Sequence, residues 1–466
     1  MTDDAFQTVA GVLGNVLEWY DFGIYGFFSD TIAQVFFPPS NTGHHNLILS
    51  YIVFGGAFVM RPLGGVITGH IGDKSGRKRA LVFSLFSMVV PTVAMGFLPT
   101  YEQVGGWSTA SLVICRMLQG FSVGGQLPSS IVYTLETKPK EHWGYYGSFV
   151  NMAANVGVIL GNLVGALIRQ ILTDDELLEW GWRAAFISGI LVLPVAIYLR
   201  VYGKEHNPNE GEYDGASDPD EANNEPGEGM YGVTRQESHP LREAVRRENW
   251  PALVSSMLVP MLYGGGYYIS VVWMAIFMET LINPPVMGAF WVNLAANCIG
   301  LTATSFFAGW LSDWVGRVRT MTFGAVTVGI AAPFMLYLIS LGSTVRAMFA
   351  QMLLCFFLSF YCGPLCAWLV ERFPPKVRLT SMALGFNIGI CISSGFSPAL
   401  ATAMVKTSDI APGFIFTVFA VLGLIGMCIS TKIHTDGGVD DEARWKENTE
   451  VDFVDAIEDD LSEHLL

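Results

Sequence analysis

The chain has 466 residues, of which 51% are hydrophobic and only 14% are charged, and it contains 50 glycines. Its mean hydropathy is +0.42. Soluble globular domains do not have this profile, and an aromatic content of 13% excludes a disordered or collagen-like chain. Because a spanning helix needs about 20 mostly apolar residues, this length holds roughly a dozen spans with short connectors. We therefore predict an all-α integral membrane protein without a large soluble domain.

The formal net charge of −15 is concentrated outside the apolar segments. Residues 201–250 and 434–466, together with Asp3 and Asp4, carry a net charge of −19, which leaves the apolar body at +4. A phosphate backbone attracts Lys and Arg, so these acidic segments argue against nucleic acid as a partner. The lipid bilayer is the expected environment of the body.

Twelve apolar segments follow one another along the chain. They lie near 8–37, 47–69, 80–98, 109–135, 145–168, 183–200, 251–279, 287–311, 320–341, 347–370, 380–405 and 413–431. Basic residues gather in the even-numbered connectors, so the positive-inside rule predicts that both termini are cytoplasmic.

The composition divides the chain into four parts. We predict an N-terminal six-helix bundle at 1–202, an acidic cytoplasmic linker at 203–249, a C-terminal six-helix bundle at 250–433 and an acidic cytoplasmic tail at 434–466. The linker is too rich in Gly, Pro, Asn and acids to bury a core. Its last part, HPLREAVRRENW, suits a short juxtamembrane helix at the lipid interface, or serves only as a basic orientation signal.

A motif occurs twice, 240 residues apart. GHIGDKSGRKR at 69–79 matches GWLSDWVGRVR at 309–319. The identical pairs are Gly69 and Gly309, Asp73 and Asp313, Gly76 and Gly316, Arg77 and Arg317, and Arg79 and Arg319. A second echo places a Glu three residues before a Pro, at Glu136 and at Glu371. Both copies follow the second span of a six-span unit, which predicts two parallel repeats with the substrate site between them. We assign the motif to a cytoplasmic gate.

The residues of this loop lead to a family. GHIGDKSGRKRAL and RMLQG at 116–120 resemble signature motifs of the major facilitator superfamily. LGNVLEWYDFGIYGFF at 13–28, RPLGGVITGHIGDKSGRKRAL at 61–81, RMLQGFSVGG at 116–125, GYYGSF at 144–149 and WGWRAAF at 180–186 are similar to the metabolite:proton symporter branch. Members carry proline, betaine, 2-oxoglutarate, citrate or shikimate with protons. One departure is Gln126, where relatives usually have an acid, so no family contact is carried over there.

The resemblance implies a secondary active transporter that works by alternating access. It implies a plasma (cell) membrane location, a proton gradient as driving force, no cofactor, and function as a monomer.

Ionisable residues inside spans are candidates for proton coupling, because a mid-membrane charge costs at least ~2.5–3.5 kcal/mol. Glu18 and Asp21 are three residues apart and share one face of the first span, and Arg116 lies well inside the fourth. In one interpretation an acid takes and releases the proton while Arg116 holds the deprotonated carboxylate. In the other, a permanent ion pair locks helices one and four together.

Polar residues at helical spacing define candidate cavity walls. The predicted cavity residues are Arg61, Gln119, Gln126, Asn151, Asn155, Asn162, Tyr263, Tyr267, Asn293 and Asn297. On another face of the fifth span, Gly157, Gly161 and Gly165 are expected to pack against a neighbouring helix. For each Asn the alternative is an interhelical hydrogen bond worth roughly 0.6–1.7 kcal/mol.

No catalytic arrangement or metal site is evident, so we predict that the chain is not an enzyme. Only Arg61 and Arg116 are candidate cations for a substrate, and tyrosine rings can contact a quaternary ammonium group. This favours symport of a small zwitterion such as proline or betaine. A mono- or dicarboxylate:proton symporter of the 2-oxoglutarate or shikimate type and a non-transporting nutrient sensor are the alternatives.

Overall fold

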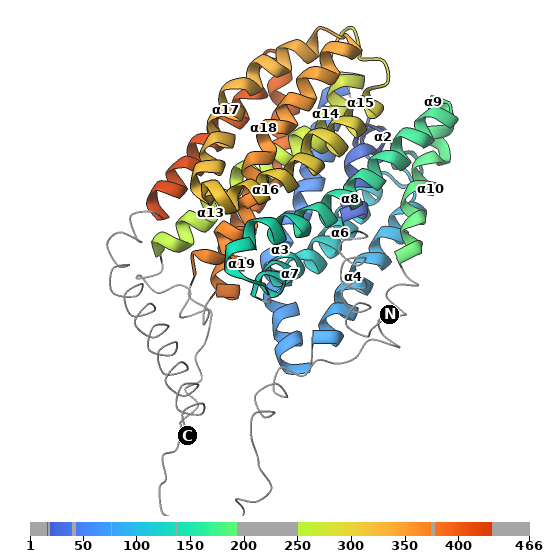
Figure 1. The fold of residues 1–466 in the computed structure, drawn as a ribbon. Coiled ribbons are helices and arrows are strands. Elements are labelled where there is room, and N and C mark those ends of the chain that lie inside the picture. The colour runs from blue at the N-terminus through green and yellow to red at the C-terminus, as the bar shows by residue number, and fades with distance from the viewer. Residues whose placement is uncertain are drawn as a thin grey trace, which may run out of the picture.

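A computed structural model describes residues 16, 19–39, 43–75, 77–136, 138–192, 250–373 and 378–430. All regular secondary structure in these ranges is helical. The helices form two bundles side by side, the first running from blue to green and the second from yellow-green to red (Figure 1). Eight of the described helices are long and apolar enough to cross a membrane. The predicted linker and acidic tail lie outside the described residues.

The N-terminal bundle begins with helical residues 19–27, which continue into α2. Its further elements are α2 (Ser29–Val35), α3 (Gly43–Ser75), α4 (Arg77–Phe97), α5 (Tyr101–Val104), α6 (Gly106–Val123), α7 (Gln126–Glu136), α8 (Trp143–Ile171), α9 (Asp174–Glu176) and α10 (Trp182–Ile187). Gly124 and Gly125 separate α6 from α7, so the predicted fourth span is made of two helices.

The C-terminal bundle contains the most deeply buried span, which begins at Trp250. Its elements are α13 (Trp250–Tyr268), α14 (Met274–Ile276), α15 (Ala289–Ala295), α16 (Thr304–Val315), α17 (Arg317–Ser340), α18 (Thr344–Glu371), α19 (Arg378–Val405) and a final helix over Gly413–Ser430. Each of these elements falls on one of the apolar segments from seven to twelve.

Three π-helical segments interrupt the seventh and eighth spans. Ile269–Trp273 and Phe277–Leu281 flank α14, and Ala296–Ala303 separates α15 from α16. A π-helical turn widens the backbone and shifts its hydrogen-bond register, and such turns occur frequently at functional sites. These segments therefore mark the interior of the second bundle as a place where side chains meet exposed backbone groups.

Glycines let helices approach closely within and between the bundles. A Cβ atom added at Gly157 of α8 would lie 2.1 Å from the carbonyl oxygen of Val16, which confirms the predicted packing of this row on a neighbouring helix. One added at Gly55 of α3 would lie 2.3 Å from the carbonyl oxygen of Gly395 in α19. The two halves thus touch through backbone at this point.

The duplicated motif forms the junction between two helices. Gly316 ends α16 and precedes α17 with a φ of 103°. L-residues with a side chain rarely adopt this conformation, so glycine is required where the chain turns from one helix directly into the next. Gly76 holds the equivalent position in the sequence repeat, but it is not among the described residues.

Candidate functional site

A buried polar network joins the first, third and fourth spans of the N-terminal half. The side-chain nitrogen Nε2 of Gln119 donates to Asp21 Oδ2 at 2.7 Å and to Thr92 Oγ1 at 2.8 Å. Arg116 Nη1 donates to Gln119 Oε1 at 2.8 Å and lies 3.9 Å from Asp21 Oδ2. Gln119 therefore stands between the predicted acid and the predicted arginine and contacts both.

The network is closed to solvent and incompletely satisfied. Asp21 is 2% exposed, and both Arg116 and Gln119 are fully buried. Among the described residues, Asp21 Oδ1 and the Nε and Nη2 atoms of Arg116 have no hydrogen-bond partner. The guanidinium group lies 4.1 Å from the centre of the Tyr25 ring, which offsets part of its burial cost. A buried carboxylate with one unpartnered oxygen can accept a proton without first breaking a hydrogen bond at that atom.

Arg61 lies in α3 and is 2% exposed. Its guanidinium carbon is 4.1 Å from the Phe58 ring centre, 5.0 Å from that of Phe22 and 5.9 Å from that of Trp19. In the part of the chain that the structure describes, neither Nε nor Nη2 has a hydrogen-bond partner. Arg61 forms no ion pair with any residue that the structure describes.

An uncharged network occupies the corresponding region of the C-terminal half. Asn293 Nδ2 donates to the Val271 carbonyl at 2.7 Å, and Gln351 Nε2 donates to the Ser270 carbonyl at 3.0 Å. Gln351 also donates to Asn293 Oδ1, and Asn297 Nδ2 lies 3.5 Å from the Val271 oxygen. The two carbonyls belong to the π-helical segment Ile269–Trp273. These amides hold the widened backbone of the seventh span.

The polar face of α8 is buried, and its three asparagines differ. Asn151 Nδ2 donates to the Cys362 carbonyl at 2.9 Å, and its Oδ1 accepts from Tyr263 Oη at 3.3 Å, so this residue links the two halves. Asn155 is 6% exposed. Asn162 is fully buried, and neither of its amide atoms has a hydrogen-bond partner among the residues that the structure describes. For Asn151 the interhelical bond considered from the sequence is therefore present.

Aromatic rings of both halves meet near Arg61. The Trp19 ring centre lies 6.2 Å from that of Tyr267 and 6.3 Å from that of Tyr268. Tyr267 and Tyr268 are 5.5 Å apart, and the ring centre of Tyr263 is 6.0 Å from that of Tyr267. Tyr268, like Trp19, escaped the sequence analysis because single aromatic residues on an apolar helix carry no distinct signal.

At one end of α8 the duplicated motif joins the halves, in what we term the Asp313 latch. Asp313 Oδ1 and Oδ2 accept hydrogen bonds, each 2.9 Å long, from the backbone N–H groups of Gly144 and Tyr145. Arg317 lies 2.5 Å from Asp313 and 3.2 Å from Glu371. The carboxylate thus caps the N-terminus of a helix in the other half, where the helix dipole favours negative charge.

At the opposite end of α8 a second ionic cluster joins the halves, which we term the Arg169 latch. Arg169 Nη2 lies 2.6 Å from Asp30 Oδ1, and Arg169 Nη1 lies 3.2 Å from Glu279 Oε2. Asp30 belongs to the N-terminal half and Glu279 to the seventh span. This cluster was not predicted from the sequence, because charges are common at the ends of spans and carry no separate signal there.

The structure does not describe the surroundings of several predicted site residues. These are Glu18, Gln126, Asp73 and Arg77, with the glycines Gly69 and Gly76 of the same motif. Asp73 lies near the end of α3, and Arg77 is the first residue of α4. Their proposed roles therefore rest on sequence alone.

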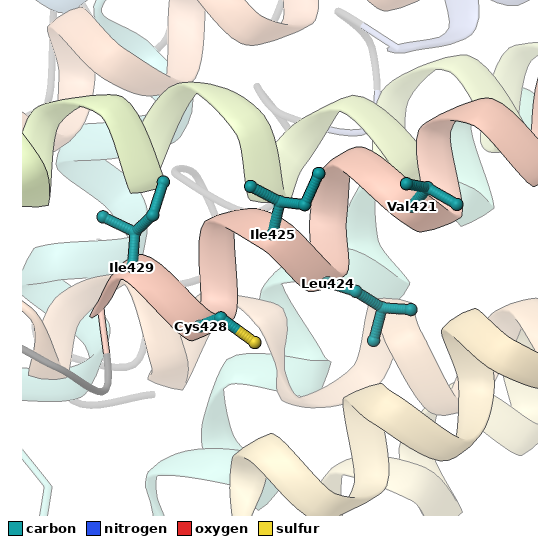
Figure 2. A pocket seen from close by; sticks show the side chains of 5 residues that line it. All are labelled: Val421, Leu424, Ile425, Cys428 and Ile429. Atoms are coloured by element: carbon teal, nitrogen blue, oxygen red, sulfur yellow. The ribbon is translucent and has the colours of Figure 1, made fainter.

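A hollow on the last helix is unrelated to these networks. Val421, Leu424, Ile425, Cys428 and Ile429 line it, and Figure 2 shows their side chains along the Gly413–Ser430 helix. The lining is aliphatic apart from one sulfur atom, and Val421 is 50% exposed. Such a surface suits lipid contact.

Among the described residues no group of three or more His, Cys, Asp or Glu side chains is placed to hold a metal ion.

Comparisons with known proteins agree with this architecture. The sugar (and other) transporter family matches residues 7–435. A proline/betaine transporter of Salmonella typhimurium is 29% identical over 420 residues, covering 89% of this chain and 81% of that protein. A citrate-proton symporter of Klebsiella pneumoniae is 27% identical over 425 residues, covering 89% of each chain.

Solved structures share the fold. That of the D-xylose-proton symporter superposes with a TM-score of 0.68 at 18% identity, covering 91% of this chain and 96% of that one. The partially occluded inward-open conformation of the xylose transporter XylE from E. coli gives a TM-score of 0.67 over 92% and 97% of the two chains. The predicted twelve-helix major facilitator fold is confirmed. The chain belongs to the sugar (and other) transporter family of the major facilitator superfamily and is a multi-pass membrane transporter, not an enzyme.

Proposed function

We propose that this transporter moves a small zwitterionic metabolite together with protons, and that Asp21 carries the proton. The observation that carries the proposal is the buried Asp21–Gln119–Arg116 network. The names of the relatives, a proline/betaine transporter and a citrate-proton symporter, support small polar substrates and proton coupling. The proton gradient is the driving force, and no cofactor takes part.

The network offers a physical route to coupling. Ionised Asp21 holds the Gln119 amide and attracts Arg116, whose nearest nitrogen is 3.9 Å away. A proton on Asp21 removes that attraction and leaves Arg116 as an uncompensated buried cation. A buried unpaired charge is costly, so the protonated state favours arrival of a group with negative charge. Proton binding and binding of a substrate carboxylate thus reinforce each other.

The charges of the site favour a substrate with one carboxylate. Arg61 and Arg116 are the buried cations of the described N-terminal core, and Asp21 already faces one of them. A second candidate is a dicarboxylate, because the Nε and Nη2 atoms of both arginines have no hydrogen-bond partner among the described residues. The zwitterion, unlike the dicarboxylate, has a quaternary or secondary ammonium group that the nearby aromatic rings can bind.

Alternating access requires the two latches to open in turn. In the proposed orientation, with both termini cytoplasmic, the Asp313 latch closes the cytoplasmic side and the Arg169 latch closes the outer side. Both are formed here, which suits an occluded state of the cycle. We further propose the plasma membrane as location, action as a monomer, and a cytoplasmic linker at 203–249 between bundles at 1–202 and 250–433.

Reconstitution tests the coupling assignment. Wild-type protein in proteoliposomes should accumulate betaine or proline when the outside is made acidic, and Asp21→Asn should abolish this accumulation. Because the amide keeps the shape of the site, Asp21→Asn should still exchange labelled for unlabelled substrate without a gradient. Asp175→Asn, at an exposed position, is the matched control.

Two results would contradict the proposal. Gradient-driven accumulation by Asp21→Asn would show that Asp21 is not the proton carrier. A wild-type protein that binds ligand but moves none would be a sensor and not a transporter.

A further inference from the structure

The strongest unexplained feature of the interior is the Nε–Nη2 edge of the Arg61 guanidinium group. Its guanidinium face lies on the Phe58 ring at 4.1 Å, while Nε and Nη2 have no partner among the described residues although the residue is 2% exposed. Ring contacts use the face of a guanidinium group and leave its in-plane N–H groups available. Nε and Nη2 form the side of the fork that binds a carboxylate through two parallel hydrogen bonds. Such an edge can bind a carboxylate.

No described residue supplies that anion. Asp21 and Arg116 face each other through Gln119, and Arg61 has no ion pair in the described part of the chain. A desolvated cation without a counter-charge is costly, and the rings of Phe22 and Phe58 offset only part of that cost. A ligand carboxylate at this edge would neutralise the charge.

The surroundings of Arg61 also indicate what the rest of the ligand is like. Trp19 lies 5.9 Å from the guanidinium carbon, and its ring in turn meets those of Tyr267 and Tyr268 from the other half. Ring faces bind a quaternary ammonium group well, because its charge is spread over methyl groups that need no hydrogen bonds. The three ring centres are only 5.5–6.3 Å apart, so an inserted ammonium group must separate rings of opposite halves.

We propose that the Nε–Nη2 edge of Arg61 binds the carboxylate of the transported substrate, and that Trp19, Tyr267 and Tyr268 surround its ammonium group. This inference rests on the proposed function and names the site for its substrate class. The substrate is a small zwitterion. Because the rings come from both halves, the ammonium group sits where the halves part and meet during alternating access.

The test is a titration of purified full-length protein by calorimetry, without any proton gradient. The probes are glycine betaine, choline, which lacks the carboxylate, and 3,3-dimethylbutyrate, which keeps the shape and carboxylate but replaces the charged nitrogen by carbon. We expect the wild type to bind glycine betaine at least about tenfold more tightly than either analogue, because each lacks one of two charge interactions.

Two variants separate the ends of the ligand. Arg61→Lys replaces the fork by a point charge, so it should weaken glycine betaine and 3,3-dimethylbutyrate by a similar factor, about tenfold or more. Trp19→Leu should weaken glycine betaine several-fold and leave 3,3-dimethylbutyrate almost unchanged. Arg346→Lys and Trp314→Leu, at exposed positions, are matched controls that should bind like the wild type.

The outcomes are distinct from those that test proton coupling. Asp21→Asn leaves Arg116 uncompensated, as protonated Asp21 does, so it should bind glycine betaine at least as tightly as the wild type, and a failure of coupling leaves the site intact. Unchanged glycine betaine binding by folded Arg61→Lys, equal binding of choline, tighter binding of citrate, or no binding of glycine betaine by the wild type would each overturn the site. Should Arg61→Lys fail to fold, the two analogues on the wild type decide the question alone.

Discussion

The two halves of the molecule place different chemistry at equivalent points of the repeat. Arg116 in α6 and Gln351 in α18 each lie 20 residues before the Glu of the repeated Glu-x-x-Pro pattern. Each side chain reaches toward the first helix of its own half. Arg116, with Gln119, faces the carboxylate of Asp21, whereas Gln351 donates to the backbone carbonyl of Ser270. One half holds charge where the other holds only neutral dipoles.

The difference shows what duplication kept and what it changed. The six-helix architecture and the motif between the second and third helices recur in both halves. The interior partners do not. A carboxylate beside a guanidinium group can take up a proton, while amides bound to carbonyls of a π-helical segment cannot. In the proposed mechanism the N-terminal half takes up the proton, and the C-terminal half holds the seventh span in shape.

The largest expected effect comes from placing charge in the neutral half. Gln351 is fully buried, and no described residue nearby offers a carboxylate. Gln351→Arg should lower the free energy of unfolding by about 3–5 kcal/mol, as expected for an uncompensated buried charge. The thermal unfolding midpoint in detergent and the folded yield measure this.

Gln351→Met is the matched control for that variant. It has a similar volume, carries no charge and loses only the two amide hydrogen bonds, so it should be much less destabilised. If Gln351→Arg is as stable as Gln351→Met, the C-terminal core tolerates charge, and the contrast between the halves is wrong.

The reverse change neutralises the charged half. Arg116→Gln places in the fourth span the glutamine that the tenth span has at the equivalent position, Gln351. It leaves Asp21 without its cation. Asp21 should then stay protonated throughout the cycle, so uptake driven by a pH gradient should fall by about 100-fold or more. Exchange of labelled for unlabelled substrate without a gradient should fall much less. Gradient-driven uptake within a few-fold of the wild type would mean that the arginine only locks helices.

The sequence predicted the fold more completely than the site. Apolar segment length and the basic connectors define the helices, because the bilayer fixes the length of a span and the side of its charges. Asp21 and Arg116 were identified for the same reason, since a charge inside a span is rare. Gln119 was assigned to the cavity wall, and its contacts with both Asp21 and Arg116 depend on how three helices pack.

Other features could not be read from helical spacing. Asn151 and Asn293 share the stripe pattern of cavity residues, yet both bind backbone carbonyls on neighbouring helices. The Arg169 latch joins residues 139 and 110 positions apart in the chain. Its members stand at span ends, where charges are common and carry no separate signal.

The two latches allow the next comparison, with a moderate expected effect. The Asp313 carboxylate is 4% exposed and binds two backbone N–H groups and Arg317, whereas Glu279 is 36% exposed and, among the described residues, binds Arg169 alone. Exposed ion pairs contribute about 1 kcal/mol or less. Asp313→Asn should therefore slow turnover by about tenfold with little change in ligand affinity, and Glu279→Gln should slow it less.

Distances between spin labels show which side each variant opens. Labels at Lys138 and Arg319 report on the Asp313 end, and labels at Asp174 and Met287 report on the Arg169 end; all four positions are exposed. Asp313→Asn should lengthen distances at the first pair and Glu279→Gln at the second. Equal lengthening at both pairs by either variant would show that the latches do not act separately.

The smallest expected effects are on stability, and they come from the two asparagines of the neutral network, Asn293 and Asn297. Asn293 donates to the Val271 carbonyl at 2.7 Å and accepts from Gln351, whereas Asn297 lies 3.5 Å from the same carbonyl oxygen. An interhelical hydrogen bond in a membrane protein contributes roughly 0.6–1.7 kcal/mol. Asn293→Ala should lower the free energy of unfolding by about 1–2 kcal/mol, because it also leaves a buried carbonyl and a buried amide without their partner. Asn297→Ala should change it by less than about 0.6 kcal/mol, since its contact is at the limit of hydrogen-bond length. Chemical unfolding in mixed micelles measures both, and a larger loss for Asn297→Ala would mean that Asn297, and not Asn293, holds the π-helical segment.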